Sequence, residues 1–164
     1  MKLKVCGVMD ARFAVAAERL GVDYLGFIFA RESPRCVTAA QAADIAARLT
    51  ERATRVGVFT HSHVDAILET VSRTGIRTIQ LHAWYSENEV CRLRDEGLTV
   101  WLLDDGPRFR VTAADGIVVD GRQGAQRGGT GIVADWNRAR ELSASGVFTI
   151  LAGGLSSANI NAAA

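Results

Sequence analysis

Short apolar runs alternate with longer stretches of helical period along this chain, and that alternation constrains the fold more than any other feature. Seven apolar runs are predicted to be strands: Lys2–Val5, Tyr24–Ala30, Arg55–Phe59, Thr78–Leu81, Thr99–Leu103, Gly116–Val119 and Phe148–Ala152. Strands that are separated by helices pair in parallel, and parallel strands are buried on both faces. The pattern therefore predicts an α/β fold, and both an open doubly wound sheet and a (β/α)₈ barrel fit it.

The segments between these strands carry helix signals. The predicted helices are Ala11–Leu20, a helix that starts at Thr38, Val64–Arg73, Ser86–Glu96, Asp135–Ser145 and Ser157–Ala164. Capping-box sequences open the second and the fourth of them. In the first helix, an apolar face at helical spacing is formed by Phe13, Ala16, Ala17 and Leu20.

Two features depart from a complete barrel. Only twelve residues, Asp104–Asp115, lie between the fifth and sixth strands, and a βαβ crossover needs about 10–12 residues at minimum. Because this segment has no helical stripe, it is predicted to be a loop or a single turn. The 164 residues also end soon after the seventh strand, whereas a (β/α)₈ barrel typically takes about 250.

The charge balance and the apolar runs limit the partners. Nineteen basic and eighteen acidic side chains leave a formal net charge of +1, and neither sign forms a block. We therefore expect neither nucleic acid nor a membrane surface as a partner. The longest apolar run, Tyr24–Ala30, has seven residues, whereas a membrane-spanning helix needs about 20. A small molecule is the expected partner.

Cysteine usage and the N-terminus predict a cytoplasmic location. Three widely spaced cysteines, Cys6, Cys36 and Cys91, form no CxxC pair, which argues against a disulfide framework and against a structural zinc site. The N-terminal residues lack the apolar region of a signal peptide. His61 and His63 lie in one loop without a third ligand nearby, so we expect no metal site.

Reactive groups in parallel α/β proteins collect at the carboxyl ends of the strands. The predicted strands lead in turn to Cys6-Gly7, Ser33-Pro34-Arg35, Val56–Phe59, Gln80-Leu81-His82, Asp120 with the glycine-rich loop 124–131, and Ala152–Leu155. From residue type alone, Cys6 is either a core cysteine or a reactive thiol, and Asp120 either caps a loop or transfers a proton. His82 either lines a pocket or is a hydrogen-bonded residue at a strand end.

Taken in order, these segments resemble the phosphoribosylanthranilate isomerases of tryptophan biosynthesis. The matching pieces are Lys4–Gly7, Asp23–Phe29 with Ser33–Arg35, Val56–Phe59, Gln80–His82, Gly128–Gly131 with Asp135-Trp136, and Leu151–Leu155. The resemblance implies a cofactor-free Amadori rearrangement of N-(5-phosphoribosyl)anthranilate to 1-(2-carboxyphenylamino)-1-deoxyribulose 5-phosphate. It also implies a TIM-type barrel in a single domain, residues 1–164. We expect that barrel to be incomplete, with seven strands, no fifth helix and no eighth βα unit.

The resemblance assigns the proton-transfer roles to two residues. It implies that Cys6 is the general base and Asp120 the general acid. Elementary chemistry agrees with this pair, because opening the ribose ring requires a proton on the ring oxygen, and moving the double bond requires loss of the proton on C2. An acid and a base are therefore needed on opposite sides of the sugar.

The resemblance assigns substrate-binding roles to four more residues. Arg35 is expected to bind the anthranilate carboxylate, for which a guanidinium fork is well suited. Gly153 and Gly154 precede a predicted helix start at Ser156–Ser157 and are expected to bind part of the phosphate. His82 is expected to help line the pocket.

Several departures from the family pattern leave alternatives open. Ala83-Trp84 replaces a glycine and a small polar residue, Cys36 replaces an aromatic residue, and Ile132 replaces a lysine. An incomplete barrel has two edges with unpaired backbone groups, which a homo-oligomer, a rearranged C-terminus or residues beyond position 164 would cover. The alternative to an active isomerase is an inactive or weakly active truncated homologue that acts as a phosphate-ligand-binding or assembly module. A third alternative is another phosphosugar enzyme on the same scaffold.

Overall fold

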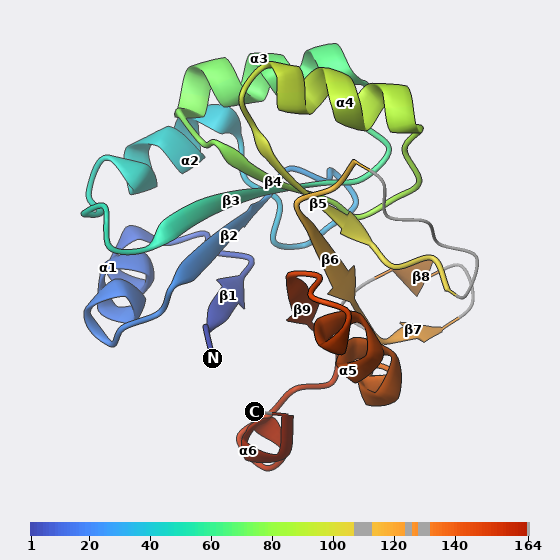
Figure 1. Cartoon of the computed structure of the whole chain (residues 1–164). Helices are drawn as coiled ribbons and strands as arrows, with labels where there is room; N and C mark the ends of the chain where they lie inside the picture. Colours follow the sequence, from blue (N-terminus) through green and yellow to red (C-terminus); the bar gives the residue numbers. More distant parts are fainter. Residues whose placement is uncertain (107–112, 124–125, 128–131, 164) are drawn as a thin grey trace. The chain divides into compact units, whose positions relative to one another are not determined.

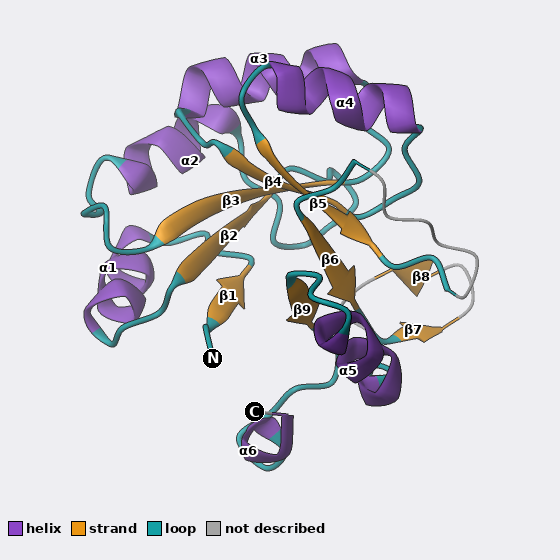
Figure 2. Ribbon diagram, viewed as in Figure 1, coloured by secondary structure: helices purple, strands orange, loops and turns teal. Residues whose placement is uncertain are grey.

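The computed structural model describes residues 1–106, 113–123, 126–127 and 132–163, and the chain divides into two compact units, Met1–Val100 and Trp101–Ala164. Helices and strands alternate along the first unit, whereas in the second unit several strands precede the first helix (Figures 1 and 2). In chain order, the elements are β1 (Lys4–Cys6), α1 (Ala11–Arg19), β2 (Tyr24–Ile28), α2 (Ala39–Ala46), β3 (Thr54–Phe59), α3 (Val64–Thr74), β4 (Thr78–Leu81), α4 (Glu87–Asp95), β5 (Thr99–Leu103), β6 (Gly116–Val119), β7 (Arg122–Gln123), β8 (Gln126–Arg127), α5 (Trp136–Ala144), β9 (Thr149–Leu151) and α6 (Ile160–Ala163).

The strand order distinguishes between the two architectures that the sequence allows. Seven strands form one sheet in the order β1-β2-β3-β4-β5-β6-β9, and every pairing that is described between them is parallel. This order follows the chain without a reversal, whereas a doubly wound sheet reverses its order at a switch point. The predicted α/β fold of the TIM type with seven parallel strands is therefore confirmed.

The first unit is a layer of helices on one face of strands β1 to β4 (Figure 1). Its core combines apolar residues of β2, such as Leu25 and Phe27, with Ala14 and Ala17 of α1 and Ile45 of α2. Because side chains alternate along a strand, Gly26, between Leu25 and Phe27, and Ile28 belong to the opposite face of the sheet. That opposite face carries the candidate site.

The second unit contains the end of β5 together with β6, β9 and helix α5. Apolar residues of β6, Ile117 and Val119, pack with Ala139 and Leu142 of α5. After β6, the short strands β7 and β8 pair in an antiparallel hairpin, where the sequence predicted only a glycine-rich loop. Residues 113–115 and 104–106 contain no helix, and the rest of the predicted loop before β6 lies outside the described residues.

The helix starts follow the predicted caps. The Thr38 hydroxyl accepts a hydrogen bond from the Gln41 amide, and the Gln41 side chain accepts one from the Thr38 amide, which completes the capping box of α2. Ser86 and Glu89 form the same arrangement at the start of α4. The prediction at the other end of the chain was wrong: the last helix begins at Ile160 rather than at Ser157.

The buried face of α1 differs from the apolar face that the sequence shows. Phe13 and Leu20 are 50% and 86% exposed, whereas Ala14, Ala17 and the charged Glu18 are buried. Apolar periodicity therefore identified the helix, but of the predicted apolar face only Ala17 is buried. The small alanine side chains let α1 pack closely against the sheet, and Glu18 is drawn inward by hydrogen bonds to the backbone.

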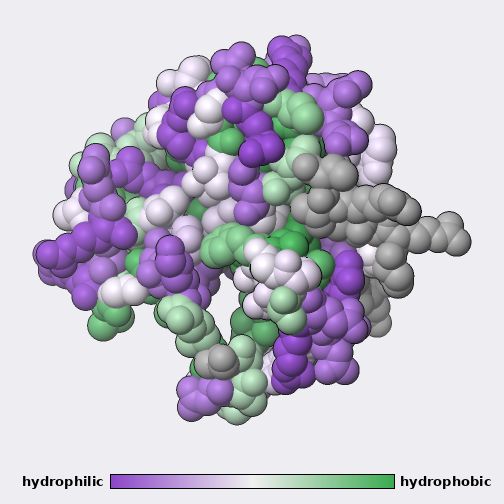
Figure 3. Space-filling view, in the orientation of Figure 1, coloured by the Kyte–Doolittle hydropathy of each residue, from purple (hydrophilic) through white to green (hydrophobic). Residues whose placement is uncertain are grey.

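The outer surface of the first unit is mainly hydrophilic over α3 and α4 (Figure 3). The described helices include none with the length and apolar content that crossing a bilayer requires.

Glu18 ties the end of α1 to the turn before β3. Its carboxylate accepts hydrogen bonds from the backbone amides of Thr50 (2.9 Å) and Ala53 (3.3 Å). Burial by itself raises the pKa of Glu18, but these bonds and the nearby Arg55 charge outweigh it, so the pKa lies below the ordinary value of 4.5. The carboxylate therefore stabilises the fold at neutral pH.

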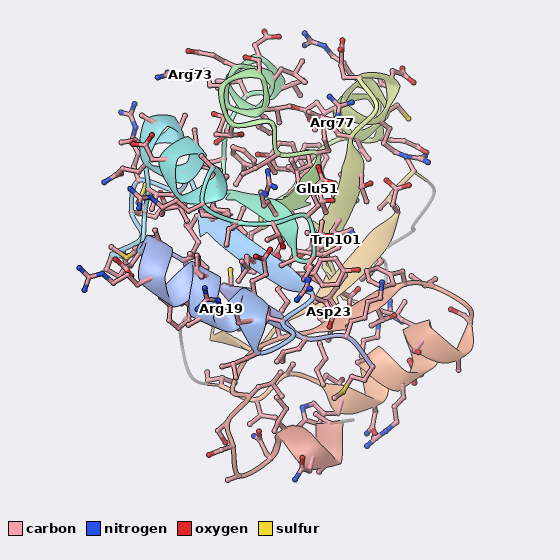
Figure 4. All side chains as sticks on the ribbon, turned by 90° about the vertical axis from the view of Figure 1, so that its left-hand side faces the viewer. Arg19, Asp23, Glu51, Arg73, Arg77 and Trp101 are labelled. Atoms are coloured by element: carbon pink, nitrogen blue, oxygen red, sulfur yellow. The ribbon has the colours of Figure 1, made fainter. Side chains whose placement is uncertain are left out.

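We predict that Glu18→Gln lowers the free energy of unfolding by about 1–3 kcal/mol at pH 7, because the new amide group turns a donor toward a backbone donor. Since the folded-state pKa is lowered, the wild-type advantage is complete above pH 4.5 and is lost as the pH falls through the folded-state value. Urea unfolding at several pH values measures this difference. Glu51→Gln, at the exposed neighbour labelled in Figure 4, is the control and should change stability by less than about 0.5 kcal/mol. Equal losses in both variants would contradict the assignment.

Candidate active site

Cys6 lies at the end of β1 on the sheet face that is turned away from the helices. It is paired in register with Gly26 of β2, and a Cβ added at Gly26 would lie 2.8 Å from Cys6 Sγ. The thiol thus occupies the space that a side chain at position 26 would fill. Ile28 and Val58 pack beside it on the same face. The glycine makes room for the sulfur, so Gly26 is part of the site although it carries no reactive group.

The Arg35 side chain lies across the turn that follows β1. Its Nη1 donates a hydrogen bond to the Cys6 carbonyl oxygen (2.9 Å). A Cβ at Gly7 would lie 2.7 Å from Arg35 Cδ and 2.9 Å from Nε, and Gly7 has a φ of +87°, in the left-handed region. Gly7 is therefore required both for the backbone turn and for the approach of the arginine. Cys6 and Arg35 are brought together as one local arrangement.

Two further links connect the loops that follow β2, β3 and β4. The Thr60 hydroxyl donates to the Glu32 carboxylate, which joins the loop after β2 to the loop after β3. The Tyr85 hydroxyl donates to the Ser62 carbonyl (2.9 Å) and accepts from the Ser62 amide (3.1 Å), which joins the loop after β3 to the loop after β4. Together with the Arg35 bond, these contacts link four consecutive loops.

The electrostatics of these links match their geometry. The hydrogen bond from Thr60 lowers the pKa of Glu32, so this carboxylate stays ionised at neutral pH. Burial raises the pKa of the Tyr85 hydroxyl, although the bond with the Ser62 backbone opposes that rise, so the phenol stays protonated as a donor. Neither group needs a change of protonation to hold its loop.

His82 follows β4 directly and is buried, with 7% of its surface exposed. Its backbone amide continues the ladder by donating to the Phe59 carbonyl (2.8 Å). Its Nδ1 lies 3.0 Å from Nε2 of Gln80, two residues earlier on the same face of β4. Gln80 pairs in register with Val58, so it belongs to the face that carries Cys6.

In the second unit, Asp120 lies immediately after β6 and next to the glycine pair that follows β9. A Cβ at Gly153 would lie 2.5 Å from Asp120 Oδ1 and would collide with the Gly121 backbone. A Cβ at Gly154 would lie 2.7 Å from the Val133 backbone. Both glycines have positive φ, 82° and 62°, so no other residue type fits this loop without strain. The structure thus brings Asp120 and Gly153 together.

An ion pair at the end of β5 was not foreseen from the sequence. Arg138 of α5 donates from Nε to Asp104 Oδ2 (3.0 Å) and from Nη2 to Oδ1 (3.3 Å), and the Asp104 side chain is buried. The hydrogen bond with Asp104 raises the pKa of the Arg138 guanidinium. This fork-shaped pair holds the start of α5 against the strand end.

The predicted site residues thus fall into two groups. Cys6, Arg35 and His82 belong to the first unit, and Asp120, Gly153 and Gly154 to the second, and each group is described within its own unit. The matching segment Gly128–Gly131 lies outside the described residues. Within the described part of the chain, no group of three or more potential ligands is suited to a metal ion.

Sequence reasoning missed Gln80 as a partner of His82, as well as the Glu32–Thr60, Ser62–Tyr85 and Asp104–Arg138 contacts. Only the position of Gln80 two residues before His82 on a strand gave a local signal. The other contacts join residues of different loops or elements, and no spacing in the sequence shows them.

Comparison with known proteins decides the family. The model of N-(5'-phosphoribosyl)anthranilate isomerase matches residues 3–164. A relative named N-(5'-phosphoribosyl)anthranilate isomerase from Rubrobacter xylanophilus is 34% identical over 169 residues, which cover 99% of this chain and 82% of the relative. The chain belongs to the phosphoribosylanthranilate isomerase family.

Solved structures of this family share the fold. The phosphoribosylanthranilate isomerase of Thermus thermophilus superposes with a TM-score of 0.87 at 27% identity, covering 99% of this chain and 81% of that one. A structure of monomers generated from the dimeric enzyme of Thermotoga maritima superposes with a TM-score of 0.76 at 25% identity, covering 99% and 80%.

We predict that Gly7→Ala destabilises the protein more than Gly75→Ala does. Both glycines have positive φ, 87° and 69°, so both variants carry the backbone strain of about 1–3 kcal/mol, but a Cβ at Gly75 would have no described neighbour within 4 Å. The additional loss of unfolding free energy in Gly7→Ala is attributed to the displacement of the Arg35 side chain. Chemical unfolding measures both losses, and the excess should vanish when Arg35→Ala is combined with Gly7→Ala. An excess that persists in the double variant would show that displacement of Arg35 does not cause the extra loss of stability.

Proposed function

We propose that this protein catalyses the Amadori rearrangement of N-(5-phosphoribosyl)anthranilate to 1-(2-carboxyphenylamino)-1-deoxyribulose 5-phosphate in tryptophan biosynthesis. The observation that carries the proposal is the family match over residues 3–164, within which Cys6 and Arg35 form one hydrogen-bonded arrangement at the end of β1. The reaction is an isomerisation, so no group is gained or lost overall.

The first proton transfer opens the sugar ring. Asp120, in its protonated form, gives a proton to the ring oxygen as the bond between that oxygen and C1 breaks. The lone pair of the anthranilate nitrogen forms a C1–N double bond, so the open-chain intermediate is an iminium ion. The position of Asp120 directly after β6, beside Gly153, supports its assignment as the acid, because this loop follows a strand end.

The second proton transfer moves the double bond. Cys6, in its thiolate form, takes the proton from C2, a double bond forms between C1 and C2, and the electron pair of the C–N double bond returns to nitrogen. The resulting enolamine takes up a proton at C1 and loses the hydroxyl proton at C2, which leaves the ketone. The contact of Cys6 Sγ with the bare Gly26 backbone supports this role, since it leaves the thiol on the sheet face that the helices do not cover.

Three binding contacts complete the proposal. The Arg35 guanidinium binds the anthranilate carboxylate, and the backbone of Gly153 and Gly154 binds part of the phosphate. His82 lines the pocket from the end of β4.

We further propose that the enzyme acts in the reducing cytoplasm, where its three free cysteines are stable as thiols. We propose a homo-oligomer as well, which the dimeric enzyme of the Thermotoga maritima relative supports. A weakly active homologue that binds phosphate ligands is the second candidate. The observation in its favour is Ile132, which stands where the family pattern has a lysine.

We predict that Cys6→Ser and Asp120→Asn each lower the turnover of phosphoribosylanthranilate by about 100-fold or more, because each removes one of the two proton-transfer groups. The fluorescence of the anthranilate substrate follows its consumption. Cys91→Ser and Asp95→Asn change exposed residues of the same types on α4 and should retain activity. Full activity in Cys6→Ser or in Asp120→Asn would contradict the role proposed for that residue.

Genetic complementation distinguishes the two candidate functions. Growth of an isomerase-deficient tryptophan auxotroph that carries the wild-type gene would favour the enzyme over the weakly active homologue.

A further inference from the structure

The side-chain amide of Gln80 is hydrogen-bonded through only one of its two polar atoms within the described part of the chain. Gln80 lies in β4 and is 4% exposed. Its Nε2 is 3.0 Å from His82 Nδ1, whereas its Oε1 is buried and has no hydrogen-bond partner among the residues that the structure describes. Buried polar atoms in proteins are nearly always satisfied, so an orphan oxygen beside a site histidine needs an explanation.

The orientation of this amide decides where the neutral histidine carries its proton. An amide nitrogen can only donate, so His82 Nδ1 must be the acceptor and must be unprotonated. The reverse orientation would turn the amide oxygen toward Nδ1 and move the amide nitrogen into the buried position where Oε1 has no hydrogen-bond partner among the described residues. A buried carbonyl oxygen without a partner is tolerated better than buried N–H groups without acceptors. The orientation that is observed therefore leaves the less unfavourable atom unpaired.

We propose that Gln80 is a positioning residue that holds neutral His82 as the Nε2–H tautomer, so that the histidine presents a hydrogen-bond donor. A donor suits the substrate class proposed above, whose phosphate, carboxylate and ring oxygens all accept. The consequence for substrate rests on the proposed function, whereas the tautomer itself does not.

The chain offers a direct spectroscopic test. It contains three histidines, His61, His63 and His82, so ¹⁵N-histidine labelling gives three ring systems, and the signals that disappear in His82→Gln belong to His82. We expect the ring of wild-type His82 at pH 8 to show an unprotonated Nδ1 and a protonated Nε2. In Gln80→Glu, a carboxylate of the same shape can only accept, so the proton should move to Nδ1. A wild-type ring that is protonated at Nδ1 would overturn the proposal.

Kinetics separate the positioning role from a structural one. We expect Gln80→Glu to lower kcat/KM by about 10-fold to 100-fold. Loss of a residue that orients a metal-binding histidine usually has an effect of this size, and Gln80 orients His82 in the same way. Gln80→Met, which has a similar shape and no polar atom, should lose less, because it permits both tautomers. In a His82→Gln background, where the side-chain amide supplies a donor without help, Gln80→Glu should have little effect.

Two results on activity would overturn the positioning role. One is an equal loss for Gln80→Glu in the wild-type and His82→Gln backgrounds, and the other is full activity in Gln80→Glu while its Nδ1 is protonated. A wild-type protein that lacks isomerase activity but shows the Nε2–H tautomer would refute the proposed function and leave the tautomer assignment standing.

Discussion

The hydrogen bond from Arg35 to the Cys6 carbonyl, made across the bare backbone of Gly7, is the contact on which the first half of the site depends. It fixes the residue that is proposed to take the proton and the residue that is proposed to bind the carboxylate in one arrangement. The positive φ of Gly7 turns the chain away from β1, and the missing side chain lets the guanidinium reach the carbonyl. Any larger residue at this position would separate the two groups.

The same principle continues along the sheet of the first unit. The Glu32–Thr60 and Ser62–Tyr85 contacts carry the linkage from the second loop to the fourth, on the side where the strands end. On the opposite side, where the strands begin, Glu18 holds the turn before β3 and Asp23 accepts the Leu3 amide (2.7 Å). Arg77, also labelled in Figure 4, donates to the carbonyl oxygens at the end of α4. Side chains that bind backbone groups thus fix both ends of the strands, and the site inherits its geometry from them.

Local sequence predicted the elements where local physics determines them. Strands β4, β5 and β6 and the capping boxes of α2 and α4 follow from apolar runs and from side-chain caps, which act within a few residues. The buried side of α1 did not follow, because it depends on Glu18 reaching a turn 32 residues away. The β7–β8 hairpin and the late start of α6 were missed as well, since glycine-rich and alanine-rich sequences carry weak signals.

The candidate site was likewise predicted only in part from the sequence. Cys6, Arg35 and Asp120 came from short motifs at strand ends, whereas the partners that orient the site, such as Gln80 and Tyr85, are recognised only by contacts in space. The proposed reaction requires residues from both units to act on one sugar. Cys6 belongs to the first unit and Asp120 to the second. A structure with a bound ligand therefore tests whether both residues contact the same molecule.

A crystal structure of the protein with the reduced product, in which an alcohol replaces the ketone at C2, is the decisive test of the proposed proton transfers. We predict that Cys6 Sγ approaches C2 from one side and that an Asp120 carboxyl oxygen lies within about 3.5 Å of the hydroxyl derived from the ring oxygen on the other. We also predict that the guanidinium of Arg35 contacts the carboxylate of the ligand. A ligand that binds with either Cys6 or Asp120 out of reach of its carbon chain would contradict the proposed proton transfers.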